Sequence, residues 1–317
     1  MIKFSTHLKE EYALAEYALA EDANALLEKL ITFGGQAYPK FGNIVIMAGG
    51  AGSGKGFVLS NLVGIEGKVF DVDELKTLAS KTPAIIKRVK DELGVDLPQL
   101  ANNLKDPGNV GKLHGIIGDY LRLDSKVKKS LYTSIFSAAP DRKPNMIFDV
   151  TLKDLPKLEK IARDASNLGY DKKNIHIVWV VNDIEVAKAQ NLKRDRVVPV
   201  EILVNTHRGA SNTMADIINM GNSLKKYMDG DIVFAFNKVG VDAELEASFK
   251  DGDSKKLKGG MGFSGKGKKS FTKGGSYIKD AEYFYAKKQG KPPIPVDKLK
   301  ADIKRKIAEY VPKGIEW

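Results

Sequence analysis

Five short apolar runs recur along the middle of the chain, and each is followed by a stretch with helical periodicity. The runs lie at 43–48, 68–72, 145–150, 175–181 and 231–236. Segments that are apolar at nearly every position are typical of strands covered on both faces, as in parallel sheets. Strands that alternate with helices build doubly wound domains. The pattern therefore predicts an α/β fold with a five-stranded, doubly wound parallel sheet.

A long segment separates the second apolar run from the third. It spans about seventy residues, more than a simple crossover between parallel strands needs. Apolar positions at helical spacing indicate helices at 83–92, 111–123 and 126–138. We therefore expect a helical insert over residues 75–140, beside the cleft of a domain that spans residues 40–240.

The segment before this domain predicts a single helix. Ser5 can cap it, apolar residues follow at helical spacing to residue 33, and Gly34-Gly35 ends it. We expect residues 1–39 to form an N-terminal helical segment that packs on the domain.

The segment after the domain, residues 241–317, is a basic extension. Between Asp251 and Trp317 it holds 17 Lys/Arg against 8 Asp/Glu, a local excess of +9 in a chain whose net charge is +11. Residues 250–278 are mainly Gly, Lys and Ser, with too little apolar surface for a core. A basic helix is predicted at about 297–310.

Aromatic residues are interspersed through this extension, so two interpretations stay open. They are Phe263, Phe271, Tyr277, Tyr283, Phe284 and Tyr285. Lysines can follow a nucleic-acid backbone while aromatic rings stack on bases, which makes nucleic acid a candidate partner. Alternatively the extension aids solubility and its aromatic rings pack on the domain.

Composition narrows the setting. A chain of 317 residues with 43% hydrophobic and 29% charged residues is typical of a globular protein. No apolar run approaches the roughly 20 residues that cross a membrane, and the first residues lack the apolar core of a signal peptide. Cysteine is absent. We expect a cytoplasmic protein with no membrane partner, no disulfide and no thiolate metal site.

The strongest chemical signal is a glycine-rich loop after the first apolar run. Gly49-Gly-Ala-Gly-Ser-Gly-Lys55 fits G-x-x-x-x-G-K between a strand and an apolar helix. In such a loop backbone amides surround phosphate oxygens, and the lysine reaches the β and γ phosphates. The predicted nucleotide-binding residues are Gly49, Gly50, Ala51, Gly52, Ser53, Gly54, Lys55, Gly56 and Phe57.

The residue after Lys55 departs from the common motif. A Ser or Thr hydroxyl normally follows the lysine and binds Mg²⁺, but here Gly56 and Phe57 follow. The G-S-G-K-G run resembles the loop of nucleoside monophosphate kinases. We still expect Mg²⁺, held through waters and carboxylates.

Carboxylates follow two of the other strands. Asp71 and Asp73 come directly after the second run, and Asp149 and Thr151 end the third. The carboxyl ends of parallel strands face the crevice in which ligands bind. We interpret Asp73 as a base for an attacking hydroxyl, with Asp71 positioning groups or organising the metal. Asp149 is a predicted Mg²⁺ ligand and Thr151 a substrate contact. The alternative is that Asp73 caps the helix that follows the second strand, and that Asp149 and Thr151 cap the helix at 152–167.

Basic residues follow the fourth strand. Arg194 and Arg196, then the pair His207-Arg208, are placed to close over a nucleotide. Guanidinium groups match phosphate oxygens and stabilise charge on a phosphoryl group in transfer. Arg194, Arg196 and Arg208 are therefore candidate lid residues, although arginines at a solvated helix end are the alternative. Asn237, at the end of the fifth strand, is a candidate contact on the adenine side.

Together these motifs resemble the zeta-toxin and polynucleotide-kinase-like branch of P-loop kinases. The matching parts are the loop at 49–56, D-x-D-E-L-K at 71–76, the strand that ends Asp149-Val-Thr151, and the arginines after the fourth strand. The resemblance covers about residues 40–240 and implies ATP as donor, a hydroxyl as acceptor, an aspartate base and phosphate-binding arginines. Val150 stands where that family usually has Gly.

The expected function is transfer of the ATP γ-phosphate to a hydroxyl of a nucleotide, nucleotide sugar or polynucleotide. One alternative is a nucleoside monophosphate kinase with an acceptor site in the insert, where Lys87, Arg88 and Lys90 are available. Another is a nucleic-acid-binding protein whose P-loop binds nucleotide without catalysis, since the hydroxyl after Lys55 is missing.

Overall fold

The computed structural model describes most of the chain between residues 31 and 317. The described residues are 31–36, 39–237, 246–248, 266–273, 276–315 and 317. Most of the predicted N-terminal helix and most of the Gly/Lys-rich stretch lie outside them. At the end of the predicted helix, Ile31 forms an isolated parallel bridge with Val63, and Phe33 one with Gln36. The helix therefore does not reach residue 33.

Five parallel strands form the centre of the sheet, in the order β2-β3-β1-β4-β5. They are β1 (Ile44–Ala48), β2 (Lys68–Phe70), β3 (Met146–Asp149), β4 (Ile175–Asn182) and β5 (Ile232–Asn237). Every residue of β1, β4 and β5 is buried. These three apolar runs thus became strands covered on both faces, whereas Lys68 and Val69 of β2 are exposed. The prediction of an α/β fold built on parallel strands is confirmed for these five.

The sheet contains more strands than the predicted five. β8 (Ser276–Lys287) comes from the extension and pairs antiparallel with β5, which places Phe284 opposite Phe234. β7 (Lys266–Lys273) and β6 (Glu246–Ser248) continue the sheet beyond β8. The predicted strand number was wrong because the aromatic run at 283–285, which was assigned to a basic extension, belongs to a strand that joins the sheet.

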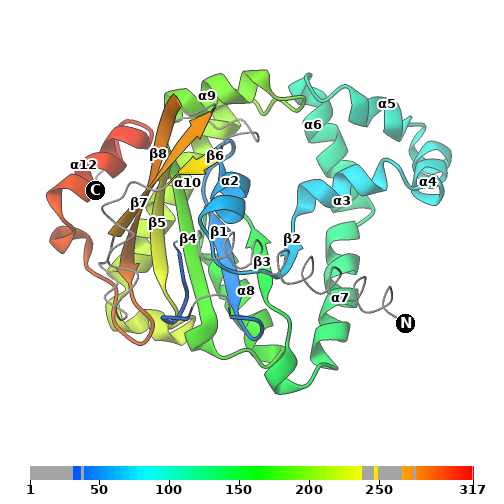
Figure 1. The fold of residues 1–317 in the computed structure, drawn as a ribbon. Helices are drawn as coiled ribbons and strands as arrows, with labels where there is room; N and C mark the ends of the chain where they lie inside the picture. The colour runs from blue at the N-terminus through cyan, green and yellow to red at the C-terminus, as the bar shows by residue number, and fades with distance from the viewer. Residues whose placement is uncertain (1–30, 37–38, 238–245, 249–265, 274–275, 316) are drawn as a thin grey trace, which may run out of the picture.

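Helices cover both faces of the sheet (Figure 1). α8 (Leu155–Asn167), α10 (Val200–Asn219) and α12 (Ala301–Tyr310) pack on one face, and α2 (Lys55–Asn61) on the other. Side chains of β1 alternate between two hydrophobic clusters: Ile44 and Ile46 face α8, whereas Val45 and Met47 face α2. This alternation follows from the period of two along a strand.

The segment between β2 and β3 forms a lobe of helices at the β2 edge of the sheet (Figure 1). Its helices are α3 (Val72–Ala79), α4 (Pro83–Leu93), α5 (Leu97–Asn102), α6 (Pro107–His114), a π-helical turn (Gly115–Tyr120) and α7 (Leu123–Phe136). The lobe has its own hydrophobic cluster, which includes Val89, Leu97, Leu113 and Ile117. Three of its helices begin with proline in the first turn, where the missing amide does no harm.

Those aromatic residues of the extension whose side chains the structure describes pack in the hydrophobic core. Tyr283, Phe284 and Tyr285 are all buried. The Tyr285 hydroxyl donates to the carbonyl of Thr32 and accepts from its amide, at 2.9 and 3.0 Å. These three rings therefore cannot stack on bases. Phe263 and the side chains of Phe271 and Tyr277 lie outside the described part of the chain.

α12 and Trp317 complete the hydrophobic cluster on the face of the sheet that α8 and α10 cover. α12 buries Ile303 and Ile307 against the sheet. Trp317 stacks on Trp179, with 5.2 Å between ring centroids, and its indole donates to the Ser211 hydroxyl at 2.6 Å. β8, α12 and Trp317 thus pack as part of the sheet domain.

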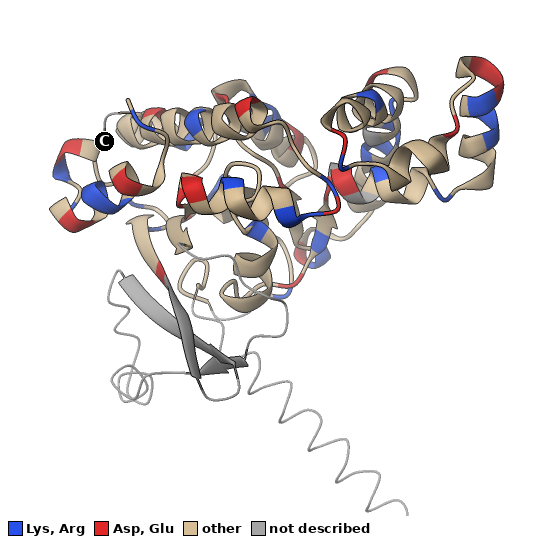
Figure 2. Cartoon of the chain, turned by 90° about the horizontal axis from the view of Figure 1, so that it is seen from above, with Lys and Arg blue, Asp and Glu red and all other residues tan. Residues whose placement is uncertain are grey.

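Charged positions are spread widely over the described helices. Figure 2 shows Lys/Arg and Asp/Glu positions interspersed on the sheet domain, on the insert and on α12. Within the described ranges, no helix is long and apolar enough to span a membrane.

Asp231 binds the segment before β1 and the segment after β8 through hydrogen bonds. It is buried, and its carboxylate accepts from the amides of Gly34 (2.6 Å) and Gln289 (2.8 Å). Burial raises the pKa of Asp231, but the contact with His176 and the two amides outweigh it, so the pKa lies below its ordinary value.

Asp231→Asn is expected to lower the free energy of unfolding by about 1–3 kcal/mol at pH 7, because bonds to a charged acceptor are lost. A depressed native pKa stabilises the fold above the unfolded-chain value of about 3.9 and ceases to do so as the pH falls through the native pKa. The difference between variant and parent should therefore shrink in acid. Urea titrations from pH 7 to pH 3 measure it, and a difference independent of pH would contradict this role.

Candidate functional site

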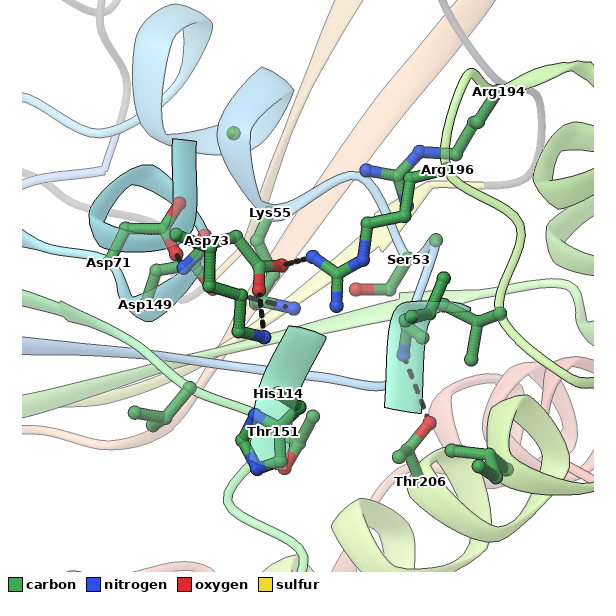
Figure 3. Close-up of a pocket in the computed structure, with 18 of the residues that line it drawn as sticks. Ser53, Lys55, Asp71, Asp73, His114, Asp149, Thr151, Arg194, Arg196 and Thr206 are labelled. Carbon is green, nitrogen blue, oxygen red and sulfur yellow. Dashed lines mark hydrogen bonds and ion pairs between the residues drawn. The ribbon is translucent and has the colours of Figure 1, made fainter. Parts of the chain in front are cut away.

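The strand order reverses at β1, which lies between β3 and β4. At such a point the connections leave in opposite directions and open a crevice at the carboxyl ends of the strands. A cavity of about 1300 Å³ lies there, bounded by the loop after β1, the ends of β2 and β3, the insert lobe and the α9–α10 region (α9, Ile184–Lys193). Figure 3 shows the side chains that converge on it.

The loop after β1 depends on its glycines. Gly49, Gly52 and Gly54 have φ values of 144°, 74° and 86°, a region that residues with a side chain rarely adopt. A Cβ on Gly50 would collide with the His207 ring, and one on Gly54 with the Asn237 amide. Glycine is therefore required both for the backbone conformation and for close packing.

The loop offers unused donors to the cavity. In the described part of the chain, the amides of Gly52, Gly54, Lys55 and Gly56 have no acceptor, the last three because the first turn of a helix lacks carbonyl partners. All four residues line the cavity. This arrangement of amides is suited to phosphate oxygens.

Gly54→Ala and Gly56→Ala form a matched pair. Alanine at 54 meets a left-handed φ and the Asn237 amide, whereas a Cβ on Gly56 meets nothing within 4 Å. We expect Gly54→Ala to lose about 1–3 kcal/mol of stability. Gly56→Ala should be neutral or slightly stabilising, since alanine is the better helix former. Urea unfolding compares them, and equal stability of the two variants would contradict these roles of the loop glycines.

Lys55 reaches back across the loop. Its Nζ lies 3.1 Å from the Gly49 carbonyl oxygen and 3.4 Å from Oδ1 of Asp149. Partial burial raises the pKa of Asp149, the Lys55 ammonium opposes this rise, and the Asp71 carboxylate adds to it. The lysine and the carboxylate at the end of β3 therefore face one space.

The two aspartates after β2 differ in their bonds. Asp71 caps α3, and its Oδ1 accepts from the amide of Asp73 at 2.8 Å. Asp73 instead binds Arg196 and, at 2.9 Å, the Lys76 ammonium. Burial raises the pKa of Asp73, but the charges of Arg196 and Lys76 outweigh it, so the pKa lies below its ordinary value. The alternative that Asp73 caps this helix is therefore wrong, because the cap of α3 is Asp71.

Thr151 and Asp149 line the cavity without capping α8. The cap of α8 is Asp154, which accepts from the Lys157 amide at 3.1 Å. The Thr151 carbonyl accepts from the amide of Gly49 at 3.2 Å. Leu152, which follows, has a φ of 49°, a costly conformation for a bulky residue. The turn that it makes keeps the end of β3 against the glycine loop.

The predicted lid arginines separate into two groups. Arg194 and Arg196 line the cavity, on the segment between α9 and α10. Asn191 holds this segment with two bonds to the backbone of Val198, at 2.6 and 3.0 Å. Arg208 is exposed on α10 and does not line the cavity.

His207 differs from its predicted role, and two nearby residues that contact the loop, Thr206 and Asn182, were not predicted. The predicted basic pair at 207–208 is wrong for His207: burial lowers its pKa to about 4, so the ring is neutral at pH 7, and Nε2 lies 2.8 Å from the Ala51 carbonyl oxygen. Thr206 accepts from the Ala51 amide at 3.0 Å. The overlooked Asn182 donates to the Gly52 carbonyl at 3.3 Å. Its position at the end of β4, opposite Asn237, was the available signal.

Asn237 lies under the loop. It is buried, and its Nδ2 donates to the Ser53 carbonyl at 3.1 Å. His114, at the end of α6, also lines the cavity from the insert lobe.

Comparison with known proteins gives structural matches. No protein-family model matches the chain, and no curated protein matches it in sequence. A structure from the PezAT chromosomal toxin-antitoxin system of Streptococcus pneumoniae is 16% identical at a TM-score of 0.34, and the match covers 69% of this chain and 74% of that one.

A second similar structure is the AvrRxo1-ORF1:-ORF2 complex with ATP. It is 10% identical at a TM-score of 0.36, and the match covers 62% of this chain and 55% of that one. The same complex with sulphate ions is 11% identical at a TM-score of 0.36. This chain thus matches a little over half the length of that one.

Proposed function

We propose that this protein is an ATP-dependent phosphotransferase that moves the γ-phosphate to a hydroxyl acceptor. One observation carries the proposal: loop amides without acceptors, the Lys55 ammonium, three carboxylates and two arginines line a single cavity. Phosphoryl transfer depends on positioning and on charge stabilisation rather than on covalent chemistry. Donors and charges of both signs around one space are suited to this task.

The glycine loop binds the phosphates of the donor. Amides of Gly52, Gly54 and Lys55 supply hydrogen bonds, and the Lys55 ammonium leaves the Gly49 carbonyl to meet the β and γ phosphates. Its charge balances that of the transferred group as the bond to the leaving oxygen lengthens.

The carboxylates fit a magnesium ion held partly by the nucleotide. Asp149 and Asp71 line the cavity beside the glycine loop, and the pKa of Asp149 is raised by burial, with Lys55 opposing the rise and the Asp71 carboxylate adding to it. The described residues contain no group of three or more His, Cys, Asp or Glu side chains able to hold a metal alone. Asp149 and Asp71 would hold Mg²⁺ together with phosphate oxygens and waters, as is usual for this ion. Bound Mg²⁺ supplies neutralisation of phosphate charge.

Asp73 is the proposed base. It accepts the proton of the acceptor hydroxyl as that oxygen bonds to the γ-phosphorus, and the bond from this phosphorus to the bridging oxygen breaks to release ADP. Arg196, which pairs with Asp73 in the structure, moves to the phosphates when they enter, which frees the carboxylate. Arg194 joins it from the same segment.

The two alternative functions have less support. Lys87, Arg88 and Lys90 are exposed and outside the cavity lining, and Arg88 pairs with Glu92 at 3.1 Å. An acceptor phosphate site at these residues is therefore not favoured. Three aromatic rings of the extension, at 283–285, are buried, which weakens the case for a nucleic-acid-binding protein without catalysis.

The test is transfer of label from γ-labelled ATP with Mg²⁺ to separate pools of nucleosides, nucleotides, nucleotide sugars and polynucleotides. We expect label on a hydroxyl of one pool and formation of ADP in equal amount. ATP binding without transfer to any pool would favour a non-catalytic role, and no ATP binding at all would end the proposal.

A further inference from the structure

The carbonyl groups of the glycine loop are all engaged. Each of the carbonyls from Gly49 to Gly54 accepts a hydrogen bond. The donors, in chain order, are Lys55 Nζ, Ser53 N, His207 Nε2, Asn182 Nδ2, Asn237 Nδ2 and Val58 N.

Three of these donors are side chains from outside the loop. Asn182 and Asn237 end β4 and β5 and are register partners there, and His207 lies on α10. All three are buried, with exposures of 1%, 1% and 6%. Buried side chains packed from a sheet and a helix have little freedom to follow the loop if it moves. They form a fixed frame beneath it.

The donor roles follow from the chemistry of the groups. A neutral imidazole beside a carbonyl oxygen must place its N–H there, so Nε2 of His207 carries the proton. Either asparagine, if its amide were reversed, would set an oxygen against a carbonyl oxygen. The Asn182 side-chain oxygen has no hydrogen-bond partner in the described structure. The bond from its nitrogen to the Gly52 carbonyl is therefore what offsets the burial of this amide.

A fixed carbonyl also fixes the next amide. In a trans peptide the C=O of one residue and the N–H of the following residue point in opposite directions within one plane. His207 holds the Ala51 carbonyl and thereby aims the Gly52 amide. Asn237 holds the Ser53 carbonyl and thereby aims the Gly54 amide. Within the described residues both amides lack acceptors, and both glycines line the cavity.

The peptide held by Asn182 is different. Its carbonyl belongs to Gly52, and the amide on its other side, that of Ser53, already donates to the Gly50 carbonyl at 3.2 Å. Asn182 therefore makes the same kind of buried bond without aiming a free donor.

We propose that His207 and Asn237 are positioning residues that aim the Gly52 and Gly54 amides at the nucleotide's phosphates. This rests on the proposed binding of ATP by the loop. Donors fixed before the ligand arrives need no reorganisation when it binds. Asn237 thus acts beneath the phosphates, in contrast to the adenine contact that its sequence position indicated.

The experiment measures the affinities of ATP and AMP for the full chain by calorimetry. AMP lacks the β and γ phosphates, so the ATP-to-AMP ratio reports the loop rather than general stability. We expect His207→Leu and Asn237→Leu each to weaken ATP binding about 10-fold, which corresponds to the loss of roughly 1.4 kcal/mol, within the range of one hydrogen bond. AMP affinity should change less than about twofold.

Two further variants separate positioning from packing. His207→Gln keeps a nitrogen donor at similar reach and should restore most of the ATP affinity. Asn182→Leu removes a matched buried bond and should cost less than about threefold. If a leucine variant fails to fold, the alanine variant at the same position, which removes the donor without adding charge or bulk, gives the same comparison.

The outcomes distinguish this inference from the function beneath it. A parent protein that does not bind ATP refutes the proposed function. A parent that binds ATP, with variants whose ATP-to-AMP ratio is unchanged, refutes the positioning role alone. The positioning role is also refuted if Asn182→Leu loses as much ATP affinity as Asn237→Leu. The affinity would then not depend on whether the held peptide presents a free amide to the cavity.

Discussion

Lys55→Ala is expected to abolish label transfer, with a fall in rate of about 10³-fold or more. Removal of one group that stabilises transition-state charge costs about 10²–10³-fold, and Lys55 adds a full charge at the centre of the site. The variant also leaves Asp149 without its cationic partner, so the pKa of Asp149 should rise further. ATP binding should weaken as well, because the ammonium contacts the ground-state phosphates.

The matched control for this variant is Lys160→Ala. Lys160 is exposed on α8 and outside the cavity lining, so its loss should leave transfer within about twofold. Label transfer is measured for both variants beside urea unfolding, and Lys55→Ala should retain the parent's cooperative unfolding. Transfer at the parent rate by Lys55→Ala would show that the loop is not the donor site.

Asp73→Asn is expected to lower the rate of transfer about 10²–10⁴-fold while ATP affinity changes little. Asparagine keeps the shape of the side chain but cannot accept the hydroxyl proton, and general-base catalysis contributes about this much. The ion pairs with Arg196 and Lys76 also disappear, which frees Arg196 for the nucleotide. A fall in rate with unchanged or tighter ATP binding is therefore the specific signature.

Asp71→Asn provides the comparison at the neighbouring carboxylate. Asparagine caps helices as well as aspartate does, so α3 should remain intact. If Asp71 helps to hold Mg²⁺, this variant should need more Mg²⁺ for half-maximal transfer, a shift that Asp73→Asn should not show. If both variants lost the same rate and neither needed more Mg²⁺, Asp71 and Asp73 would not have separate roles as metal ligand and base. Full activity of Asp73→Asn would show that Asp73 is not the base.

The central strands could be predicted from the sequence because a strand buried on both faces is apolar at nearly every position. β4 is an almost unbroken apolar run, and its short length and β-branched residues distinguish it from a helix. Position at strand ends then brought Lys55, Asp71 and Asp149 to one cavity without any knowledge of side-chain contacts.

The rest depended on long-range packing that no local pattern records. β8 was missed although Tyr283-Phe284-Tyr285 is a run of strand-forming residues, because the Gly/Lys-rich composition around it indicated an extension without a core. Its pairing with β5 is a long-range contact that the sequence does not show. His207 and Arg208 are adjacent in sequence but about 100° apart around α10. One faces the glycine loop and the other faces solvent. Only the rotation of the helix decides which side chain reaches the site.

The antiparallel strand β8 sets a condition on the order in which the chain can assemble during synthesis. The backbone groups of β5 on the side away from β4 have no strand partner until residues 282–287 have been made. The segment around Gly34 and Thr32, made first, must wait for Tyr285 and Gln289 before its contacts with the late strand are complete. We therefore expect nascent chains that stop near residue 240 to hold the glycine loop only loosely, because β5, which carries Asn237, still has a bare edge.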